Sequence, residues 1–375
     1  MSEILRKYWF VCLIAVLFIG VLIFFIVDLN KDNVSKKSAD GQDVVATTTL
    51  GNITSSDLFD ELSPNASSVL YSLYRNQVVD QAVEADSAMK AEAKQMAKNI
   101  ENNMKSDSTG KTGESIMQTL ASYGFTGDNA PYDYALTALK FRKIDTDYIR
   151  DHYDDLKIFA PEQGRTISII TMQVSNDQVL TEKAQTKQDD IQKALDEGKS
   201  FADVAKEFSE DEDTASNGGF YGYIDSSTTD LDSNVLSTAL ALENGGTSDW
   251  ISVQPDGMSL YTLYKVHVEE TDPEKLLNSD NEDVVEGFVL SMAGSVSGLE
   301  SAAVEEAAKK LDIKFENEDV EKQIKDLETQ QSEALESAKK TKQDEIASEE
   351  AAASEASSET SKADDSQASS AAEGE

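Results

Sequence analysis

The stretch FSEDEDTASNGGFYGY, residues 208–223, combines acidic residues, paired glycines and aromatic residues, as phosphate-binding, calcium-binding and peptide-binding loops do. A P-loop needs Gly-Lys-Ser/Thr after its glycines, but aromatic residues follow the glycine pair here. An EF-hand loop starting at Asp211 would need glycine at its sixth position and glutamate at its twelfth, where the chain has Ser216 and Gly222. Both kinds of site are excluded, which leaves a helix end, an acidic loop, a tight Gly-Gly turn and an aromatic strand.

Ligands for metal ions are scarce along the chain. There is one cysteine, Cys12, and the two histidines, His152 and His267, are far apart in the sequence. A zinc site would need further ligands at short, recognisable spacings, and the sequence shows none. We therefore expect no metal ion and no other cofactor, and a single cysteine allows no intramolecular disulfide.

The charge of the chain is strongly acidic, with 71 Asp and Glu against 33 Lys and Arg and a net charge of −38. This balance argues against nucleic acid as a partner, because a binder must neutralise phosphates with basic residues. Much of the acid lies in residues 344–375, which are otherwise mostly Ser and Ala. Such a segment cannot bury enough apolar surface to offset its ordering entropy, so residues 331–375 are predicted to be a disordered, solvated tail. A calcium-buffering or interaction role for the tail is the alternative.

The N-terminal run YWFVCLIAVLFIGVLIFFIV, residues 8–27, carries no charge and matches the roughly 20 residues that span a bilayer. It exceeds the apolar region of a cleavable signal peptide, which has about 7–15 residues, so we predict an uncleaved signal anchor. Basic residues flank both sides of the run. The short N-terminal flank favours residues 1–7 in the cytoplasm, with residues 28–42 as an extracytoplasmic linker. The cell membrane is then one partner, crossed once.

Helical and mixed segments alternate in the rest of the chain. Residues 43–162 and 271–330 read as mainly helical, with apolar residues at spacings of three and four. Between them, residues 163–270 follow the order β-α-α-loop-α-β-β, which is typical of a compact α+β unit. We therefore expect this unit to be inserted into one helical domain, with a strand near Val44 pairing with a strand near Ile313.

Three runs within the inserted unit, FADVAKEFSEDEDTASNGGFYGY, STALALENGGTSDWISV and LYTLYKV, resemble the parvulin family of peptidyl-prolyl isomerases. With the flanking helices and LGNITSSDLFDEL in front, residues 42–330 are similar to the PrsA-type extracytoplasmic foldases of Gram-positive bacteria. The ordered pattern Phe-x-x-Val-Ala, Phe-Ser and Gly-Gly carries the resemblance. It implies a parvulin-like antiparallel sheet with surrounding helices.

The resemblance also implies a small polar cluster that favours the twisted amide of an X–Pro bond. In parvulins this cluster has two histidines and a Cys or Asp. Asp211, two residues after Ser209, matches the Cys or Asp position, but Thr171 and Thr262 stand where the histidines would be. We predict these three residues as the candidate catalytic group and leave open whether isomerase activity survives.

The proline pocket of the family corresponds to Tyr221, Leu231 and Val235. Valine in place of a larger phenylalanine should hold a proline ring less well, yet the three residues still predict an apolar groove for a side chain of an extended peptide. Apart from Asp211, the acids from Glu210 to Asp213 are interpreted as a solvated loop at a helix end.

Three functional hypotheses follow from the resemblance. The first is a membrane-anchored extracytoplasmic foldase that binds unfolded or newly exported polypeptides and isomerises X–Pro bonds weakly. The second is a catalytically inactive holdase chaperone that keeps the parvulin fold for peptide binding. The third is a structural envelope protein with one fixed partner. A homodimer is an assembly open to each of them.

Overall fold

The computed structural model describes residues 38–39, 42–48, 51–54, 67–106, 108–254, 257 and 259–369. Contacts between Cα atoms divide the chain into two compact units. The helical unit comprises residues 1–145 and 300–333, and the sheet unit comprises residues 146–299 and 334–375. The predicted domain boundaries at residues 163 and 270 stay a prediction.

The predicted membrane anchor lies outside the described residues. Among the residues that are described, no single helix has the length and hydropathy of a membrane span. One bent pair, α12 (Glu282–Ser295) with α13 (Leu299–Ala308), reaches those limits when its two helices are taken together.

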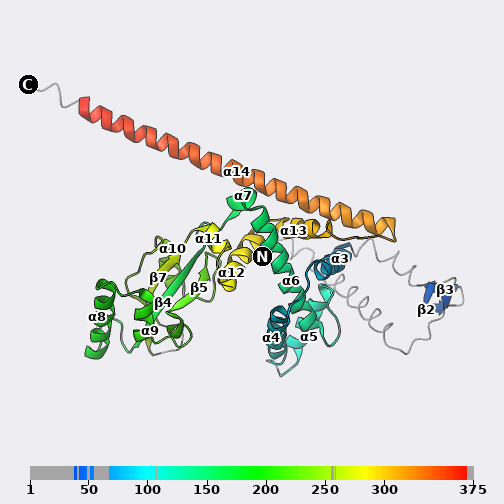
Figure 1. Ribbon diagram of the computed structural model, residues 1–375, viewed down its shortest axis with the longest axis horizontal. Helices are drawn as coiled ribbons and strands as arrows, with labels where there is room; N and C mark the ends of the chain where they lie inside the picture. The colour runs from blue at the N-terminus through cyan, green and yellow to red at the C-terminus, as the bar shows by residue number, and fades with distance from the viewer. Residues whose placement is uncertain are drawn as a thin grey trace, which may run out of the picture. The chain divides into compact units, whose positions relative to one another are not determined.

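A four-stranded antiparallel sheet forms the centre of the sheet unit (Figure 1). Its strands run in the order β5-β4-β7-β6. Their bounds are β4 Arg165–Val174, β5 Phe220–Ile224, β6 Ile251–Val253 and β7 Tyr261–Glu270. The two long strands lie in the middle, which fits the nearly continuous run of buried residues in β4. The predicted antiparallel α+β fold is confirmed.

Helices cover both faces of this sheet. On one face, Ile169 and Val266 pack against Val235 of α10 (Ser233–Ala241). On the other face, Ile170 packs against α8 (Glu182–Asp196) and α9 (Phe201–Phe208). We call these the α10 face and the α8/α9 face. Period-two alternation along β4 explains why neighbouring isoleucines serve different faces.

Side-chain caps fix where the covering helices begin. The side chains of Thr181, Ser200 and Asp232 accept hydrogen bonds from backbone N–H groups in the first turns of α8, α9 and α10. The shorter elements of the sheet unit are α7 Tyr153–Leu156, η2 Lys157–Phe159, η3 Ala215–Asn217 and α11 Pro273–Leu277.

The helical unit packs some of the methionines of α4 against its core. Its helices are α3 Ser67–Ala82, α4 Ser87–Met104, α5 Lys111–Ser122 and α6 Ala130–Asp151, with most of α13 and the start of α14. Met89 and Met96 of α4 pack against a core of Ala93, Ala135 and Leu139. These two methionines therefore belong to core packing, as their helical spacing indicates.

The predicted strand near Ile313 is not formed, so it cannot pair with the strand near Val44. Instead β2 (Gln42–Thr48) pairs with β1 (Ser38–Ala39) and β3 (Gly51–Thr54). The aromatic residue next to the expected strand, Phe315, packs against Tyr74 with ring centroids 5.9 Å apart. The short apolar run around Phe315 thus packs against α3 and does not form a strand.

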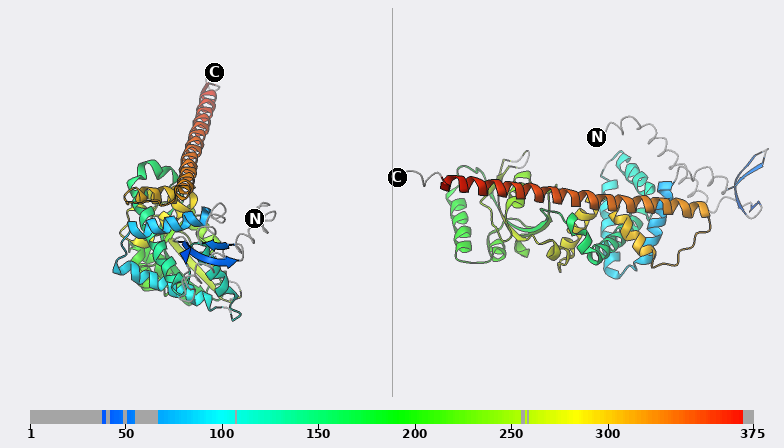
Figure 2. Two further views of the ribbon diagram at one scale, coloured as in Figure 1. Left: turned by 90° about the vertical axis from the view of Figure 1, so that its right-hand side faces the viewer. Right: turned by 90° about the horizontal axis from the view of Figure 1, so that it is seen from above.

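The prediction of a disordered tail from residue 331 is wrong up to Ser369, because α14 runs from Glu318 to Ser369 (Figure 2). Low hydrophobicity excludes a separate core but does not exclude a solvated helix. Ala, Glu, Lys and Gln dominate the segment and are strong helix formers. Pairs such as Lys322 with Asp326 add support at i,i+4 spacing.

Candidate functional site

The loop of residues 209–219 covers a free edge of β4. β5 pairs with β4 only from Arg165 to Ser168, so the backbone of the next β4 residues needs other partners. The loop supplies them: Ile169 N donates to Gly219 O at 2.7 Å, and Glu210 N donates to Thr171 O at 2.9 Å. We call this loop the edge seal, because it pairs with the backbone of β4 where β5 does not.

The glycine pair is a requirement of close packing. Gly219 has φ +78°, and a Cβ there would lie 2.3 Å from the carbonyl oxygen of Ile169. Gly218 has φ +74°, and its Cβ would lie 2.8 Å from the Cβ of Ala202 in α9. Side chains other than glycine fit neither the backbone conformation nor the space.

Asp211 is held beside Thr171 through Ser209. The Ser209 hydroxyl oxygen accepts from Thr171 N at 3.1 Å and from Asp211 N at 3.3 Å. The Asp211 carboxylate accepts a hydrogen bond from the Thr214 hydroxyl. Two of the three predicted catalytic residues, Asp211 and Thr171, are thus brought together by one serine.

The strand register places both predicted threonines on the α10 face. Thr171 lies opposite Tyr264, and Gln173 lies opposite Thr262. Directly opposed residues of antiparallel strands share a face, as do residues two apart on one strand. Thr171 and Thr262 are therefore diagonal neighbours. Thr171 is only 7% exposed, whereas Thr262 is partly exposed.

The predicted pocket residues meet on the same face at different depths. Val235 is 0% exposed and belongs to the core between α10 and the sheet. Tyr221 and Leu231 pack against that core while remaining partly exposed. Val235 is thus part of the core, and only Tyr221 and Leu231 of the three predicted pocket residues keep surface exposed to solvent.

Two residues of this cluster escaped the sequence analysis, Tyr264 and Asp230. Burial raises the pKa of Tyr264, and the charges of Asp211 and Asp232 raise it further. Burial, a hydrogen bond to Asp230 and the charges of Asp230, Tyr264 and Asp211 raise the pKa of Tyr221 to about 12. These groups form one electrostatic cluster. The sequence signal for Tyr264 is its position two residues after Thr262, which puts both on one face.

Glu210 is exposed, as predicted, but its carboxylate is also engaged with β4 and α8. Its carboxylate accepts from Gln173 N at 2.7 Å and from Lys187 Nζ of α8 at 2.6 Å. Burial acts to raise the pKa of Glu210, but the hydrogen bonds from Lys187 and Gln173 outweigh it and hold the pKa below its usual value. Glu210 therefore continues the edge seal on β4 beyond Thr171.

The two histidines lie away from this cluster. His267 pairs with Ser168 across β4 and β7, stacks on Phe201 of α9 at 5.1 Å and places Nδ1 2.8 Å from the Thr247 hydroxyl. It belongs to the α8/α9 face, which agrees with the inference that it does not replace a family histidine. The ring of His152 packs against Tyr148. Within the described part of the chain, no group of three or more His, Cys, Asp or Glu residues could hold a metal ion.

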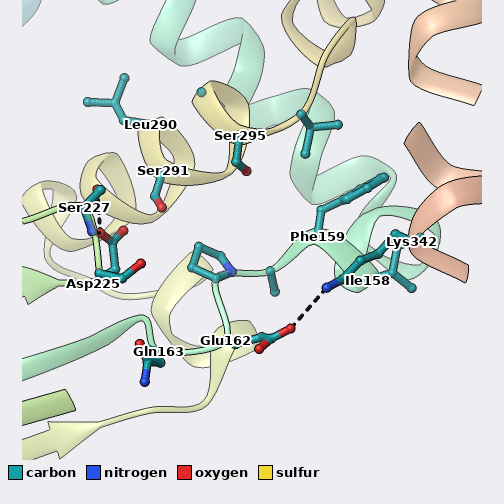
Figure 3. Close-up of a pocket in the computed structure, with 15 residues that line it drawn as sticks. Ile158, Phe159, Glu162, Gln163, Asp225, Ser227, Leu290, Ser291, Ser295 and Lys342 are labelled. Atoms are coloured by element: carbon teal, nitrogen blue, oxygen red, sulfur yellow. Dashed lines mark hydrogen bonds and ion pairs between the residues drawn. The ribbon is translucent and has the colours of Figure 1, made fainter. Parts of the chain in front are cut away.

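A second concavity of the sheet unit is a pocket of about 690 Å³ beside α12 (Figure 3). Leu290, which is 53% exposed, lies at this pocket together with Ser291 and Phe159. Asp225 is 4% exposed and accepts from Ser227 N at 2.7 Å and Ser227 Oγ at 2.6 Å. Its carboxylate is occupied in holding the turn after β5. The pocket offers hydroxyl groups, apolar carbon and the ion pair between Glu162 and Lys342.

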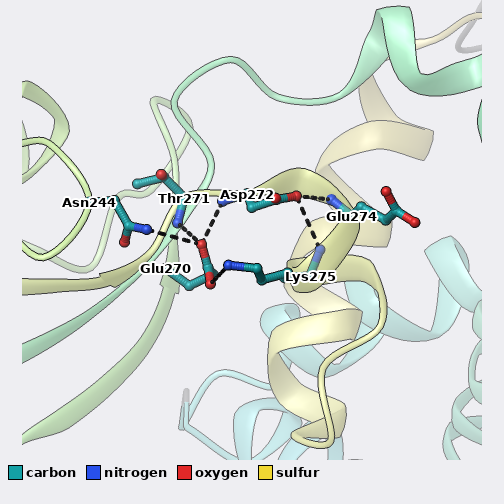
Figure 4. A network of polar contacts seen from close by, with 6 residues as sticks. All are labelled: Asn244, Glu270, Thr271, Asp272, Glu274 and Lys275. Carbon is teal, nitrogen blue, oxygen red and sulfur yellow. Dashed lines mark hydrogen bonds and ion pairs between the residues drawn. The ribbon is translucent and has the colours of Figure 1, made fainter.

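Glu270 ties the end of β7 to α11 (Figure 4). Its carboxylate accepts from Lys275 Nζ at 2.8 Å and from the backbone N–H groups of Thr271 and Asp272 at 3.0 Å. The hydrogen bond from Lys275 holds the pKa of Glu270 below its usual value, although burial opposes this. The network is a structural staple at the opposite end of β7 from Thr262.

The helical unit has a perturbed group of its own. Asp145 is 6% exposed, and burial together with the charge of Glu300 raises its pKa to about 8, while Arg75 acts in the opposite direction. Arg75 pairs with Glu300 and lies 4.9 Å from the ring centroid of Phe141. These groups come from α3, α6 and α13, so the cluster joins three core helices.

A comparison with protein families finds a match within the sheet unit. A model of the PPIC-type PPIase domain matches residues 158–254. The PPIC-type match includes β4, the edge seal, β5, α10 and β6, and it ends before β7. Thr262 and Tyr264 therefore lie beyond the matched residues and are joined to them by strand pairing.

Relatives with known names are PrsA foldases. The foldase protein PrsA of Clostridium botulinum strain Okra is 30% identical over 172 residues, which cover 44% of this chain and 49% of the relative. That of Clostridium kluyveri is 28% identical over 142 residues, 38% of each chain. The chain thus spans half or less of the length of the curated relatives it matches. The structure of PrsA from Bacillus subtilis aligns with 76% of this chain and 98% of its own, at 19% identity and a TM-score of 0.39.

Proposed function

We propose that the chain is an extracytoplasmic folding factor that binds unfolded or newly exported polypeptides and isomerises X–Pro bonds weakly. The observation that carries the proposal is the α10 face of the PPIC-type domain. There Asp211 is held beside Thr171, and Thr262 lies diagonally across from Thr171. The partly exposed Tyr221 and Leu231 pack on the same face.

The chemistry asks little of the protein. Rotation about an X–Pro bond has a barrier of about 20 kcal/mol and takes tens to hundreds of seconds without a catalyst. No nucleophile or general base is needed, because the site only has to bind the twisted amide better than the planar one. Hydroxyl groups and a carboxylate can do this, but less well than the histidines for which Thr171 and Thr262 stand.

The proposal places the functional body outside the cell, anchored by residues 8–27. Residues 163–270 would then act as the parvulin-like domain, and residues 43–162 with 271–330 as the helical part that holds clients. The clients proposed are unfolded chains, and a homodimer is compatible with the proposal.

The test uses the full-length chain purified in mild detergent. Interconversion of cis and trans X–Pro in a short peptide would be followed by exchange NMR, and suppression of aggregation of an unfolded protein would be followed in the same preparation. The proposal predicts both catalysis above background and suppression. Loss of both would overturn it.

A non-catalytic chaperone is the second candidate, favoured by the burial of two site residues. Val235 is fully buried and Thr171 is nearly so, which removes one predicted pocket residue and one predicted catalytic residue from direct contact with a peptide. This candidate predicts aggregation suppression without catalysis, so the same preparation separates the two.

A further inference from the structure

We propose that the Tyr264 hydroxyl is the hydrogen-bond donor that this domain uses in place of the missing histidines, directed at the prolyl nitrogen of a twisted X–Pro bond. This inference rests on the proposed isomerase function and names the group that would perform it. The strand register and the neighbours of Tyr264 in this chain single out its hydroxyl.

The position of Tyr264 is fixed by two strand pairings. It lies opposite Thr171 on β4 and opposite Ile251 on β6, so its side chain rises from the α10 face near the centre of the sheet. The ring packs against the core between α10 and the sheet while the residue stays partly exposed. A tyrosine in this setting keeps its ring apolar and its hydroxyl available at the rim.

The other hydroxyl groups of the cluster are less suited to the task. Thr171 is only 7% exposed, and its backbone N–H and C=O are both engaged by the edge seal. The Tyr221 hydroxyl is hydrogen-bonded to Asp230. Thr262 is partly exposed, but its side chain is several bonds shorter than a phenol. Tyr264 combines a long side chain, partial exposure and a position opposite Thr171, so we assign the donor role to its hydroxyl.

The chemistry of the twisted amide calls for such a donor. In the planar amide the nitrogen lone pair is delocalised into the carbonyl group. Rotation localises the lone pair on nitrogen, which then accepts a hydrogen bond that the planar forms cannot. A donor placed there stabilises the transition state alone and so raises the rate. A phenol with an ordinary pKa of about 10 already keeps its proton at neutral pH. Burial and the charges of Asp211 and Asp232 raise the pKa of Tyr264 further.

The test compares two substitutions that remove one oxygen from neighbouring tyrosines of β7 in the full-length chain. Tyr264→Phe keeps the ring and deletes the proposed donor. Tyr261→Phe is the matched control, because Tyr261 lies opposite Val174 and packs on the α8/α9 face. For each variant we would measure kcat/KM for a short X–Pro peptide, the Kd of the same peptide and the thermal midpoint.

The inference predicts that Tyr264→Phe lowers kcat/KM about fivefold to tenfold, the effect of one hydrogen bond in the transition state, with Kd and thermal midpoint unchanged. Tyr261→Phe should leave all three unchanged. Wild-type kcat/KM in Tyr264→Phe, or a loss matched by an equal loss of peptide affinity, would overturn the role of Tyr264 while leaving the proposed function intact. Absence of catalysis by the unmodified chain would overturn the isomerase function and the role of Tyr264 together.

Discussion

The edge-seal loop and strand β7 contrast in what their polar residues do. The loop has the more unusual sequence, yet Ser209, Glu210 and Gly219 form hydrogen bonds with the backbone of β4. β7 is unremarkable in sequence, yet it carries Thr262 and Tyr264 onto the groove face. Residue types alone therefore suggest that the functional site is the loop. The strand register instead places the candidate residues on the neighbouring α10 face.

The largest effect expected is on the stability of the edge seal, from Gly219→Ala. The new Cβ would meet the carbonyl oxygen of Ile169 and the backbone would be strained at φ +78°. We expect a loss of about 3 kcal/mol or more in the free energy of unfolding, since clash adds to strain. Chemical denaturation of the purified chain measures it.

Gly198→Ala is the control for this prediction. Gly198 has φ +86° but no heavy atom within 4 Å of the added Cβ, so strain acts alone and the loss should be about 1 kcal/mol. Equal losses for the two variants would mean that close packing of the edge seal on β4 is not what requires Gly219.

Restoring the two family histidines on the α10 face should raise the isomerase activity. The double change Thr171→His and Thr262→His should raise kcat/KM for an X–Pro peptide by about tenfold or more, because preorganised donors stabilise the twisted amide. The buried Thr171 leaves less room than Thr262, so Thr262→His alone should give part of the gain. An activity that stays flat in both variants would contradict the assignment of the groove.

Asp211 is the one loop residue for which we expect a functional role. Asp211→Ala should lower kcat/KM about fivefold through loss of one charged group at the site, with little change in unfolding free energy. Asp213→Ala, an exposed acid of the same loop, is the matched control and should leave activity unchanged. Equal activity of the two variants would assign Asp211 to the edge seal alone.

The smallest effect expected is a pH dependence from Glu210. The pKa of Glu210 is lowered in the folded chain, so its contribution is present above the unfolded value of about 4.3 and is lost as pH falls through the folded pKa. Because the carboxylate is partly exposed, this contribution should be about 1 kcal/mol or less. Unfolding curves from pH 6 to pH 3 should fall less steeply for Glu210→Gln, and parallel curves would contradict the seal at this residue.

Much of the fold could be predicted from local signals. The run RTISIITMQV forms β4, and capping residues such as Thr181 and Ser200 start the helices that follow. The prediction of a strand near Ile313 was wrong, because a strand needs a pairing partner. Phe315 packs against Tyr74 of a helix instead. The prediction of a disordered tail considered only that the segment cannot form a hydrophobic core. It did not consider the high helix propensity of Ala and Glu.

The candidate site was only partly predictable. A family pattern indicates positions such as Asp211 and Thr171, but it cannot show that Val235 is buried beneath the groove. Tyr264 and the clamp of Glu210 on Gln173 depend on which residues face each other across strands, and that information comes from the register. The alternation of side chains along a strand shows which residues share a face. Only the pairing between strands shows which residues of different strands lie side by side.

The most direct test of the assignment is to map where an X–Pro peptide binds. A short peptide with a photoreactive benzoyl-phenylalanine next to proline would be cross-linked to the full-length chain, and the adducts located by mass spectrometry. We predict cross-links at Tyr221, Leu231, Thr262 and Tyr264, which belong to the α10 face. Cross-links confined to the pocket around Leu290, with none on β7, would contradict the account.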